Sequence, residues 1–363
     1  GEGIVIPTNP RLKPGAIYLF NSRLKPEATY FDNPRLQPGD LHMINLTTTF
    51  SIPRTAHLLG PNSQVLCIGS CFAENLGQRL DQLPLEVSNQ ALGTLFHPLN
   101  ILQGLREQNL QASDLYQQGN FYVHPDFHSQ FMGENPTDFL TRLAEIKSKT
   151  IAFLKSSQFL IITWGTAFYY EDQILGRAIA NCHKQAASRF VKKQSTVEEI
   201  FLAYESFLRE NPLQKIILSV SPVRHTRDGI PENATSKAIL RVTADTLAKK
   251  FPDQVSYFPA YEIMMDELRD YRFYQSDMIH PTEQAVEYIY KRFKQAHFED
   301  ELLDIAKKWE EMLRTLEHRP HPLQYTQHRE ILLRLRKEIE DAKSSVDSSK
   351  LLAKIDQQIL ALS

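Results

Sequence analysis

Between residues 45 and 299, short apolar runs alternate with stretches in which apolar residues recur every three or four positions. The runs predict buried strands at QVLCIGS (64–70), SQFLIITWG (157–165), QKIILSVSPV (214–223) and QVSYFPAYEIM (254–264). The amphipathic stretches predict helices at 73–83, 195–211, 236–251 and 282–298. Strands that alternate with helices at this spacing indicate an α/β domain with a mainly parallel sheet and helices on both faces.

The first 44 residues have a different pattern. NPRLKPGAIYLF, NSRLKPEATYFD and NPRLQPGDLHMI follow one another as a repeat of about 12 residues. Their prolines remove backbone donors and favour extended conformation, so we expect a weakly structured N-terminal arm over 1–44. The repeat is either a translated tandem duplication without a role or an arm that docks elsewhere.

The last 64 positions, 300–363, are charged and carry apolar residues three and four apart, with a proline-containing break at RPHPLQY. This pattern predicts a C-terminal helical hairpin, which could pack on the domain or form a homodimer with a second subunit.

Charge and composition exclude several classes of protein. Lys and Arg number 41 against 43 Asp and Glu, so the surplus of positive charge that nucleic-acid binding needs is missing. The apolar runs are too short to span a bilayer. The three cysteines, Cys67, Cys71 and Cys182, lack the spacing of a disulfide framework or a zinc site. We therefore expect a soluble, cytoplasmic protein without a cofactor.

Candidate chemistry begins where the first predicted strand meets its helix, at Gly69-Ser70-Cys71. Glycine permits a tight turn, and the next side chain projects from the sheet edge beside the helix N-terminus. A serine nucleophile there needs a nearby base, and Asp277 and His280, three residues apart before the last helix of the domain, could supply an imidazole held by a carboxylate. The alternative for Ser70 is a helix N-cap.

The stretch IGSCFAENLGQRL resembles the GSCFA family of the SGNH/GDSL-type hydrolases, and ALGTLFHP, TWGTAFYY, ANCHK, SPVRH and SDMIHPT resemble the same family over about 45–297. The resemblance implies a three-layer α/β/α sandwich of flavodoxin-like type. It also implies that Ser70 is the nucleophile and that Asp277 and His280 are the acid and base.

In SGNH enzymes the oxyanion hole uses the nucleophile's amide, a glycine and the asparagine of a G-x-N-D block. The resemblance places these roles on the Ser70 amide and on Gly93. The G-x-N-D block is absent, so Thr166 or Asn181 would have to supply the third donor.

Histidines flank the predicted strands, and HPDFH places His124, Asp126 and His128 close in sequence. Pro125 disfavours a helix that would align the two imidazoles, and the usual zinc patterns are missing, so we expect no metal. His128, His183 and His225, with Arg224 and Lys184, are instead expected to line the substrate pocket or to make buried hydrogen bonds. A rival chemistry pairs Cys71 with His183 or His280.

The sequence thus predicts a serine esterase acting on a small-molecule ester, such as an O-acylated carbohydrate, or an acyltransferase with the same triad. The alternatives are a non-catalytic ligand-binding module and, third, a phosphate-group or metal-dependent hydrolase.

Overall fold

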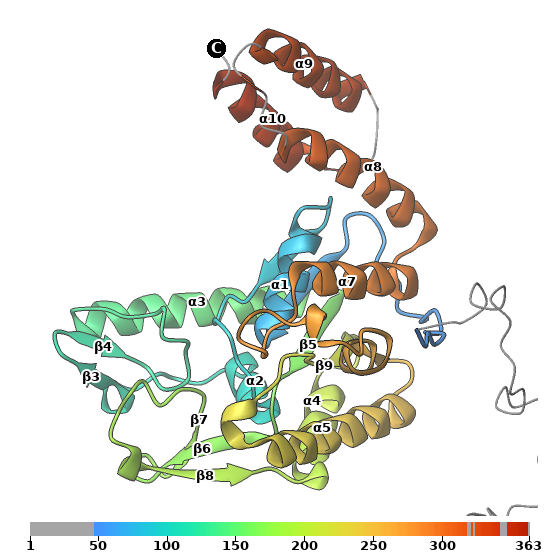
Figure 1. Cartoon of the computed structure of the whole chain (residues 1–363). Coiled ribbons are helices and arrows are strands. Elements are labelled where there is room, and N and C mark those ends of the chain that lie inside the picture. The colour runs from blue at the N-terminus through green and yellow to red at the C-terminus, as the bar shows by residue number, and fades with distance from the viewer. Residues whose placement is uncertain (1–46, 318–320, 322–323, 342–346, 362–363) are drawn as a thin grey trace, which may run out of the picture. The chain divides into compact units, whose positions relative to one another are not determined.

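The computed structural model describes residues 47–317, 321, 324–341 and 347–361 (Figure 1). The predicted N-terminal repeat arm lies outside these residues. From Thr47 onward the chain forms one compact unit.

The core of this unit is a five-stranded sheet in which every neighbouring pair of strands is parallel. In spatial order the strands are β10 (Val255–Phe258), β9 (Lys215–Val220), β5 (Phe159–Trp164), β1 (Gln64–Gly69) and β2 (Glu86–Asn89). The parallel α/β fold predicted from the sequence is confirmed, with β2 as a strand that the pattern did not indicate.

Helices cover both faces of the sheet, which explains the continuous apolar runs of its central strands. Successive residues of β1 point to opposite faces, so Val65 and Cys67 join one apolar core while Leu66 and Ile68 join the other. In Figure 1, α1 and α7 lie on one side of the sheet and α4 and α5 on the other. The helices of the domain are α1 (Cys71–Asp81), α2 (Pro98–Leu105), α3 (Pro136–Ser156), α4 (Val197–Glu210), α5 (Ile230–Lys250), α6 (Ala260–Glu262) and α7 (Glu283–His297).

The fourth predicted strand is wrong beyond Phe258, where β10 ends. Pro259 has no N–H with which to continue the ladder. The chain turns into α6 and then into a π-helix, η5 (Ile263–Glu267). Glu267 fixes this π-helix from inside, because its buried carboxylate accepts hydrogen bonds from Arg292 Nη1 at 2.5 and 2.6 Å.

Two small antiparallel sheets are inserted between elements of the main sheet, and neither was predicted. They consist of β3 (Tyr116–Gln118) with β4 (Phe121–Val123), and of β7 (Arg177–Ile179), β6 (Phe168–Asp172) and β8 (Phe190–Gln194). Short 3₁₀ turns occur at η2 (Ala112–Asp114), η3 (Ala187–Arg189), η4 (Thr226–Asp228) and η6 (Tyr271–Phe273).

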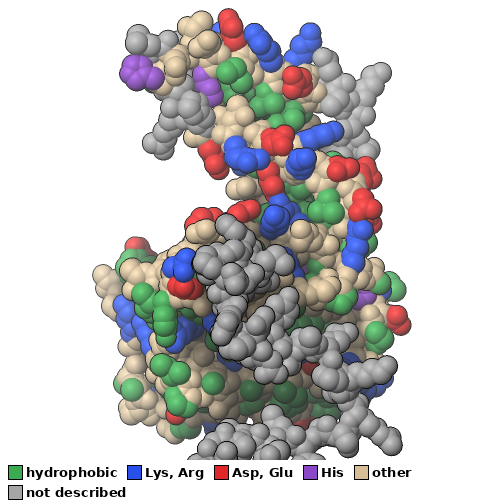
Figure 2. Space-filling view, turned by 45° about the vertical axis from the view of Figure 1, so that its right-hand side comes forward, with side chains coloured by type: hydrophobic (Ala, Val, Ile, Leu, Met, Phe, Trp, Pro, Cys, Tyr) green, Lys and Arg blue, Asp and Glu red, His purple; other side chains and the backbone are tan. Residues whose placement is uncertain are grey.

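Three helices follow the domain: α8 (Asp300–Glu317), α9 (Tyr325–Asp341) and α10 (Ser349–Ala361). They share an apolar cluster of Leu316, Leu332, Ile339, Leu351 and Ile355. On the face shown in Figure 2, side chains of both charges lie side by side on these helices. Within the described residues, every helix is too short or too polar to cross a bilayer. A homodimer through these helices stays a prediction.

Candidate active site

The turn after β1 requires a glycine. Gly69 has φ +137°, and a Cβ at this position would lie 2.2 Å from the carbonyl oxygen of Thr163 on the neighbouring strand β5. No larger residue fits without moving one of the two strands. The close approach of β1 to β5 therefore fixes where residue 70 leaves the sheet.

Ser70 lies at this edge, but its hydroxyl is occupied. The residue is fully buried and is the N-cap of α1, with Oγ accepting a hydrogen bond from the Phe72 amide at 3.3 Å. Its own N–H donates to Thr163 O at 2.9 Å. The described structure contains no hydrogen bond between Ser70 and His280, so the N-cap alternative describes this geometry.

Asp277 and His280 form the predicted pair. His280 Nδ1 lies 2.6 Å from Asp277 Oδ2, while Asp277 Oδ1 accepts hydrogen bonds from the amides of Ile279 at 2.9 Å and His280 at 3.0 Å. These bonds lower the pKa of Asp277 to about 2, with the His280 side chain as the largest cause. Since Nδ1–H donates to the carboxylate, Nε2 is left to accept a proton. Both side chains are about two-fifths exposed, at 42% and 41%.

This pair lies at the same sheet edge as Ser70. At the C-terminal end of α7, the His297 carbonyl accepts a hydrogen bond from Leu59, which precedes β1 and so lies at the opposite edge. The Asp277–His280 loop before α7 lies at the other edge, where the parallel strands end, because the amide of Arg224, just after β9, donates to Ile279 O. Arg79, in the last turn of α1, binds Glu283 and Glu287 in the first two turns of α7, so the start of α7 packs beside the end of α1.

The predicted oxyanion donors have other partners. The Ser70 amide is bound to Thr163 O, as described above. The Gly93 N–H donates to Gln90 O at 2.7 Å, within a turn in which Gly93 has φ +77°. Thr166 Oγ1 lies 3.1 Å from Ser236 Oγ and accepts the Phe168 amide at 3.1 Å. Each of these groups is already hydrogen-bonded to a protein atom. None of them is therefore free to bind an oxyanion in this geometry.

Asn181 and His183 belong to a different part of the domain from the Asp277–His280 pair. Asn181 Oδ1 accepts the His183 amide at 2.9 Å, and His183 Nε2 lies 2.9 Å from the His124 carbonyl oxygen. The Asn181 amide donates to Pro125 O. These hydrogen bonds hold the loop after β7 against the segment after β4, so His183 makes a buried hydrogen bond, one of the two roles expected for it. In the part of the chain that the structure describes, neither Asn181 nor His183 is bonded to Asp277 or His280.

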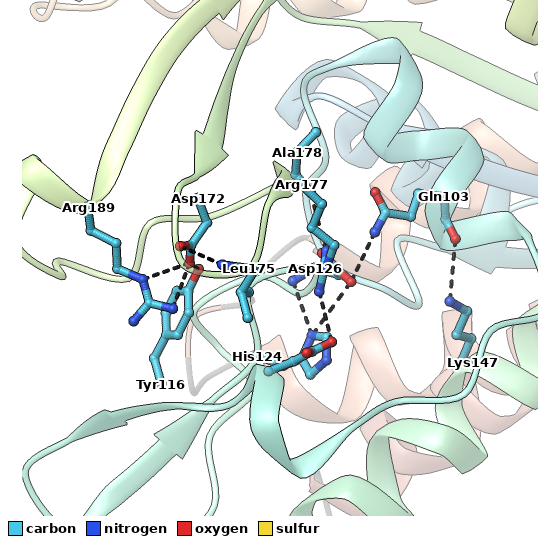
Figure 3. A network of polar contacts seen from close by, with 11 residues as sticks. Gln103, Tyr116, His124, Asp126, Lys147, Asp172, Leu175, Arg177, Ala178 and Arg189 are labelled. Carbon is cyan, nitrogen blue, oxygen red and sulfur yellow. Dashed lines mark hydrogen bonds and ion pairs between the residues drawn. The ribbon is translucent and has the colours of Figure 1, made fainter.

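Asp126 and His124 join a polar network rather than a metal site (Figure 3). Asp126 pairs with Arg177 at 2.6 Å and accepts from Gln103 Nε2 at 3.2 Å. His124 Nδ1 accepts the Asp126 amide at 3.2 Å, and burial lowers the pKa of His124 to about 4. The imidazole is therefore neutral at pH 7. The described residues contain no group of three or more side chains suited to a metal ion.

Arg224 and His225 lie beside the pair. The Arg224 amide donates to Ile279 O at 3.2 Å and its Nη1 to Met278 O at 3.1 Å, so this residue clamps the loop that carries the pair. The His225 side chain is largely enclosed, and burial, followed by the charges of Lys237 and His280, lowers its pKa to about 3. His225 is accordingly a neutral group near His280.

Two residues important for this edge were not predicted. The Gln90 side chain is buried, and its Nε2 donates to the carbonyls of Gly69 and Ser70, both at 3.2 Å. Lys237 of α5 is completely buried and donates to the carbonyls of Gly165 at 2.7 Å and Ser221 at 2.8 Å. Neither stands out in the sequence, because a Gln in a loop and a Lys in a helix are ordinarily exposed.

The two cysteines near the turn differ. Cys67 is fully buried in the core. Cys71, the first residue of α1, is partly exposed, and burial is the main cause that raises its pKa, so the thiol is protonated at pH 7. His183 Nε2 is bound to the His124 carbonyl, and the described structure contains no hydrogen bond between His183 and Cys71.

No curated protein matches the chain. A family model with the description GSCFA family matches residues 64–293 of the chain. This region starts at β1, includes the Gly69-Ser70-Cys71 turn and the Asp277–His280 pair, and ends within α7. The chain belongs to the GSCFA family.

Proposed function

We propose that this protein is a serine esterase of SGNH type acting on a small ester, with Ser70 as nucleophile, His280 as base and Asp277 as the carboxylate that orients it. The observation that carries the proposal is the 2.6 Å contact between His280 and Asp277 at the sheet edge where Ser70 begins α1. A carboxylate bound to Nδ1 leaves Nε2 as the proton acceptor, as general base catalysis requires.

The reaction has two halves. His280 Nε2 takes the Ser70 hydroxyl proton as Oγ attacks the ester carbonyl, and then gives that proton to the departing alkoxide. The same nitrogen then takes a proton from water as the water oxygen attacks the acyl-serine, and gives that proton to Ser70 Oγ as the acid leaves. If an alcohol replaces water, the same groups perform acyl transfer.

This mechanism requires Ser70 Oγ to leave its capping position. The cap is weak, since 3.3 Å exceeds the usual length of an N–H···O bond, and a lost N-cap costs about 1 kcal/mol. An oxyanion donor is also needed, and the Cys71 amide, which directly follows the Ser70 cap, is a candidate. As the first amide of α1, it lies at the positive end of the helix dipole.

A non-catalytic ligand-binding module is the second candidate. The buried, capped Ser70 and the engaged amide of Gly93 favour it, because a site without an available nucleophile or oxyanion donors would bind an ester without cleaving it.

Labelling with a fluorophosphonate probe, followed by peptide mapping, separates the two candidates. The esterase predicts stoichiometric modification of Ser70 in the wild type and in Cys71→Ala, and loss of labelling in Ser70→Ala and His280→Ala. A folded wild type that stays unlabelled, beside a serine hydrolase that labels, would refute the esterase and leave the binding module. Labelling that disappears only in Cys71→Ala would move the nucleophile to the thiol.

A further inference from the structure

An apolar hollow of about 320 Å³ adjoins the loop that carries Asp277 and His280. Its floor is formed by Met264 and Leu268, which are almost completely buried, and its accessible wall includes Met265 and Tyr271, at 38% and 68% exposure. Tyr274 completes the apolar lining. Exposed apolar side chains gathered around one hollow are typical of a binding surface.

The hollow is continuous with the Asp277–His280 loop through backbone pairing. Tyr274 forms a β-bridge with Pro281, the residue after His280, and the Gln275 amide donates to His280 O at 2.7 Å. The segment that lines the hollow and the segment that carries the imidazole are therefore hydrogen-bonded to each other, and the two sites share one wall.

Arg224 lies between them. It lines the hollow, its guanidinium carbon is 5.4 Å from the centre of the Tyr274 ring, and its Nη1 donates to Met278 O in the Asp277–His280 loop. Among the described residues Arg224 has no carboxylate partner, which leaves its charge available to a polar or anionic part of a ligand.

The π-helix η5 gives the hollow a fixed wall. Met264 and Met265 both lie in η5, whose last residue, Glu267, is bound by Arg292 and by Tyr288 Oη at 2.8 Å. Methionine side chains adapt to apolar partners of different shape. A rigid backbone that presents adaptable side chains suits a flexible apolar chain.

We propose that this hollow binds the acyl chain of the substrate and that the preferred substrates are esters of medium-length, unbranched fatty acids. A volume of about 320 Å³ holds about ten groups of the size of a water molecule, at about 30 Å³ each. Chains of about six to ten carbons fill it, whereas an acetyl group leaves it empty. The inference rests on the proposed esterase function, which supplies the ester and the His280 base.

The test compares p-nitrophenyl octanoate with p-nitrophenyl acetate as substrates. Each methylene that enters an apolar site contributes about fourfold, so we expect kcat/KM to favour the octanoate by at least about tenfold. Met265→Asp and Tyr271→Asp place a charge on exposed positions of the wall and should reduce this ratio to near one. Leu213→Asp is the matched control, because Leu213 is 89% exposed in the turn before β9, at the opposite edge of the sheet, and its ratio should equal that of the wild type.

A wild type that hydrolyses the acetate at least as well as the octanoate overturns the acyl hollow and leaves the esterase intact. If Met265→Asp and Tyr271→Asp both keep the preference for octanoate, the acyl-binding role of the hollow is also refuted. If neither ester is hydrolysed, the binding of decanoate to the protein is measured by calorimetry. Binding that Met265→Asp abolishes and Leu213→Asp retains supports the hollow while refuting the esterase, and absence of binding refutes both.

Discussion

His280 Nδ1 lies 2.6 Å from Asp277 Oδ2, and the other oxygen of the same carboxylate accepts the amides of Ile279 and His280. One carboxylate therefore both shapes the loop and orients the imidazole. Because these bonds lower the pKa of Asp277 to about 2, the group remains ionised throughout the range in which esterases are assayed.

Asp277→Asn should separate the two roles of this carboxylate. The amide oxygen can still accept the two backbone bonds and hold the loop, but the side chain no longer stabilises the imidazolium that forms during attack. We expect the rate of fluorophosphonate labelling to fall by about 10³ to 10⁴-fold in a variant that still folds. Asp245→Asn, which alters a surface carboxylate of α5 paired with Lys249, is the control and should label at the wild-type rate.

The acid dependence of the wild type gives an independent check on Asp277. Its pKa lies below the ordinary value of about 3.9, so the stability this carboxylate contributes is present above about pH 4 and is lost as the pH falls through about 2. The stability difference between wild type and Asp277→Asn should therefore be constant from pH 5 to 8 in urea unfolding and shrink only below about pH 4. A difference that shrinks between pH 5 and 7 would contradict the assigned hydrogen bonds.

Ser70→Ala tests the cap and the nucleophile together. Removal of the N-cap hydroxyl of α1 should lower the free energy of unfolding by about 1 kcal/mol, measured by urea denaturation. Thr196→Ala removes the capping box of α4 and should cost a similar amount. The two variants differ in labelling, which Thr196→Ala keeps and Ser70→Ala loses. Equal labelling of both would show that Ser70 is only a cap.

Gly69→Ala should be strongly destabilising, by about 3 kcal/mol or more, because the added Cβ meets the Thr163 carbonyl at 2.2 Å and φ is +137°. Gly119→Ala is the matched control, since Gly119 also has positive φ, +60°, but nothing lies within 4 Å of a Cβ there. Its cost should be about 1 kcal/mol in the same urea denaturation. A similar cost at both glycines would mean that backbone conformation, and not the contact with β5, explains Gly69.

Lys237 should make the free energy of unfolding increase with pH in the alkaline range. Burial lowers the pKa of Lys237 to about 7, whereas in the unfolded chain it is about 10.4. Between these values the unfolded state binds more protons, so the free energy of unfolding rises with pH, by up to about 1.4 kcal/mol per pH unit. A neutral amine still offers two N–H groups to the Gly165 and Ser221 carbonyls.

Urea denaturation of the wild type and of Lys237→Met at pH 7, 8 and 9 measures this effect. The wild type should gain stability relative to Lys237→Met at each step, because methionine has no proton to release. Parallel pH profiles would show that Lys237 stays charged in the folded protein.

Local sequence determined much of this protein. The apolar runs at 64–70, 157–165 and 214–223 are strands because β1, β5 and β9 are covered on both faces. The helix predicted at 195–211 starts for a local reason too, because Thr196 and Glu199 form a capping box whose bonds span only three residues. The Asp277–His280 contact is equally local, since its bonds join residues two and three apart in one turn. Interactions of this range depend on few residues, and the sequence displays them directly.

Only the tertiary structure decided which polar groups remain free. The Ser70 amide is occupied by Thr163, 93 positions away, because β1 and β5 pair in one register. Thr166 is bound to Ser236, which depends on how α5 packs over the end of β5. Ile263 and Met264 continued a strand pattern in the sequence, yet β10 ends before Pro259 and both residues lie in a π-helix, from which Met264 lines the hollow. A hydrogen-bond partner from a distant segment is set by packing, and spacing along the chain carries no record of it.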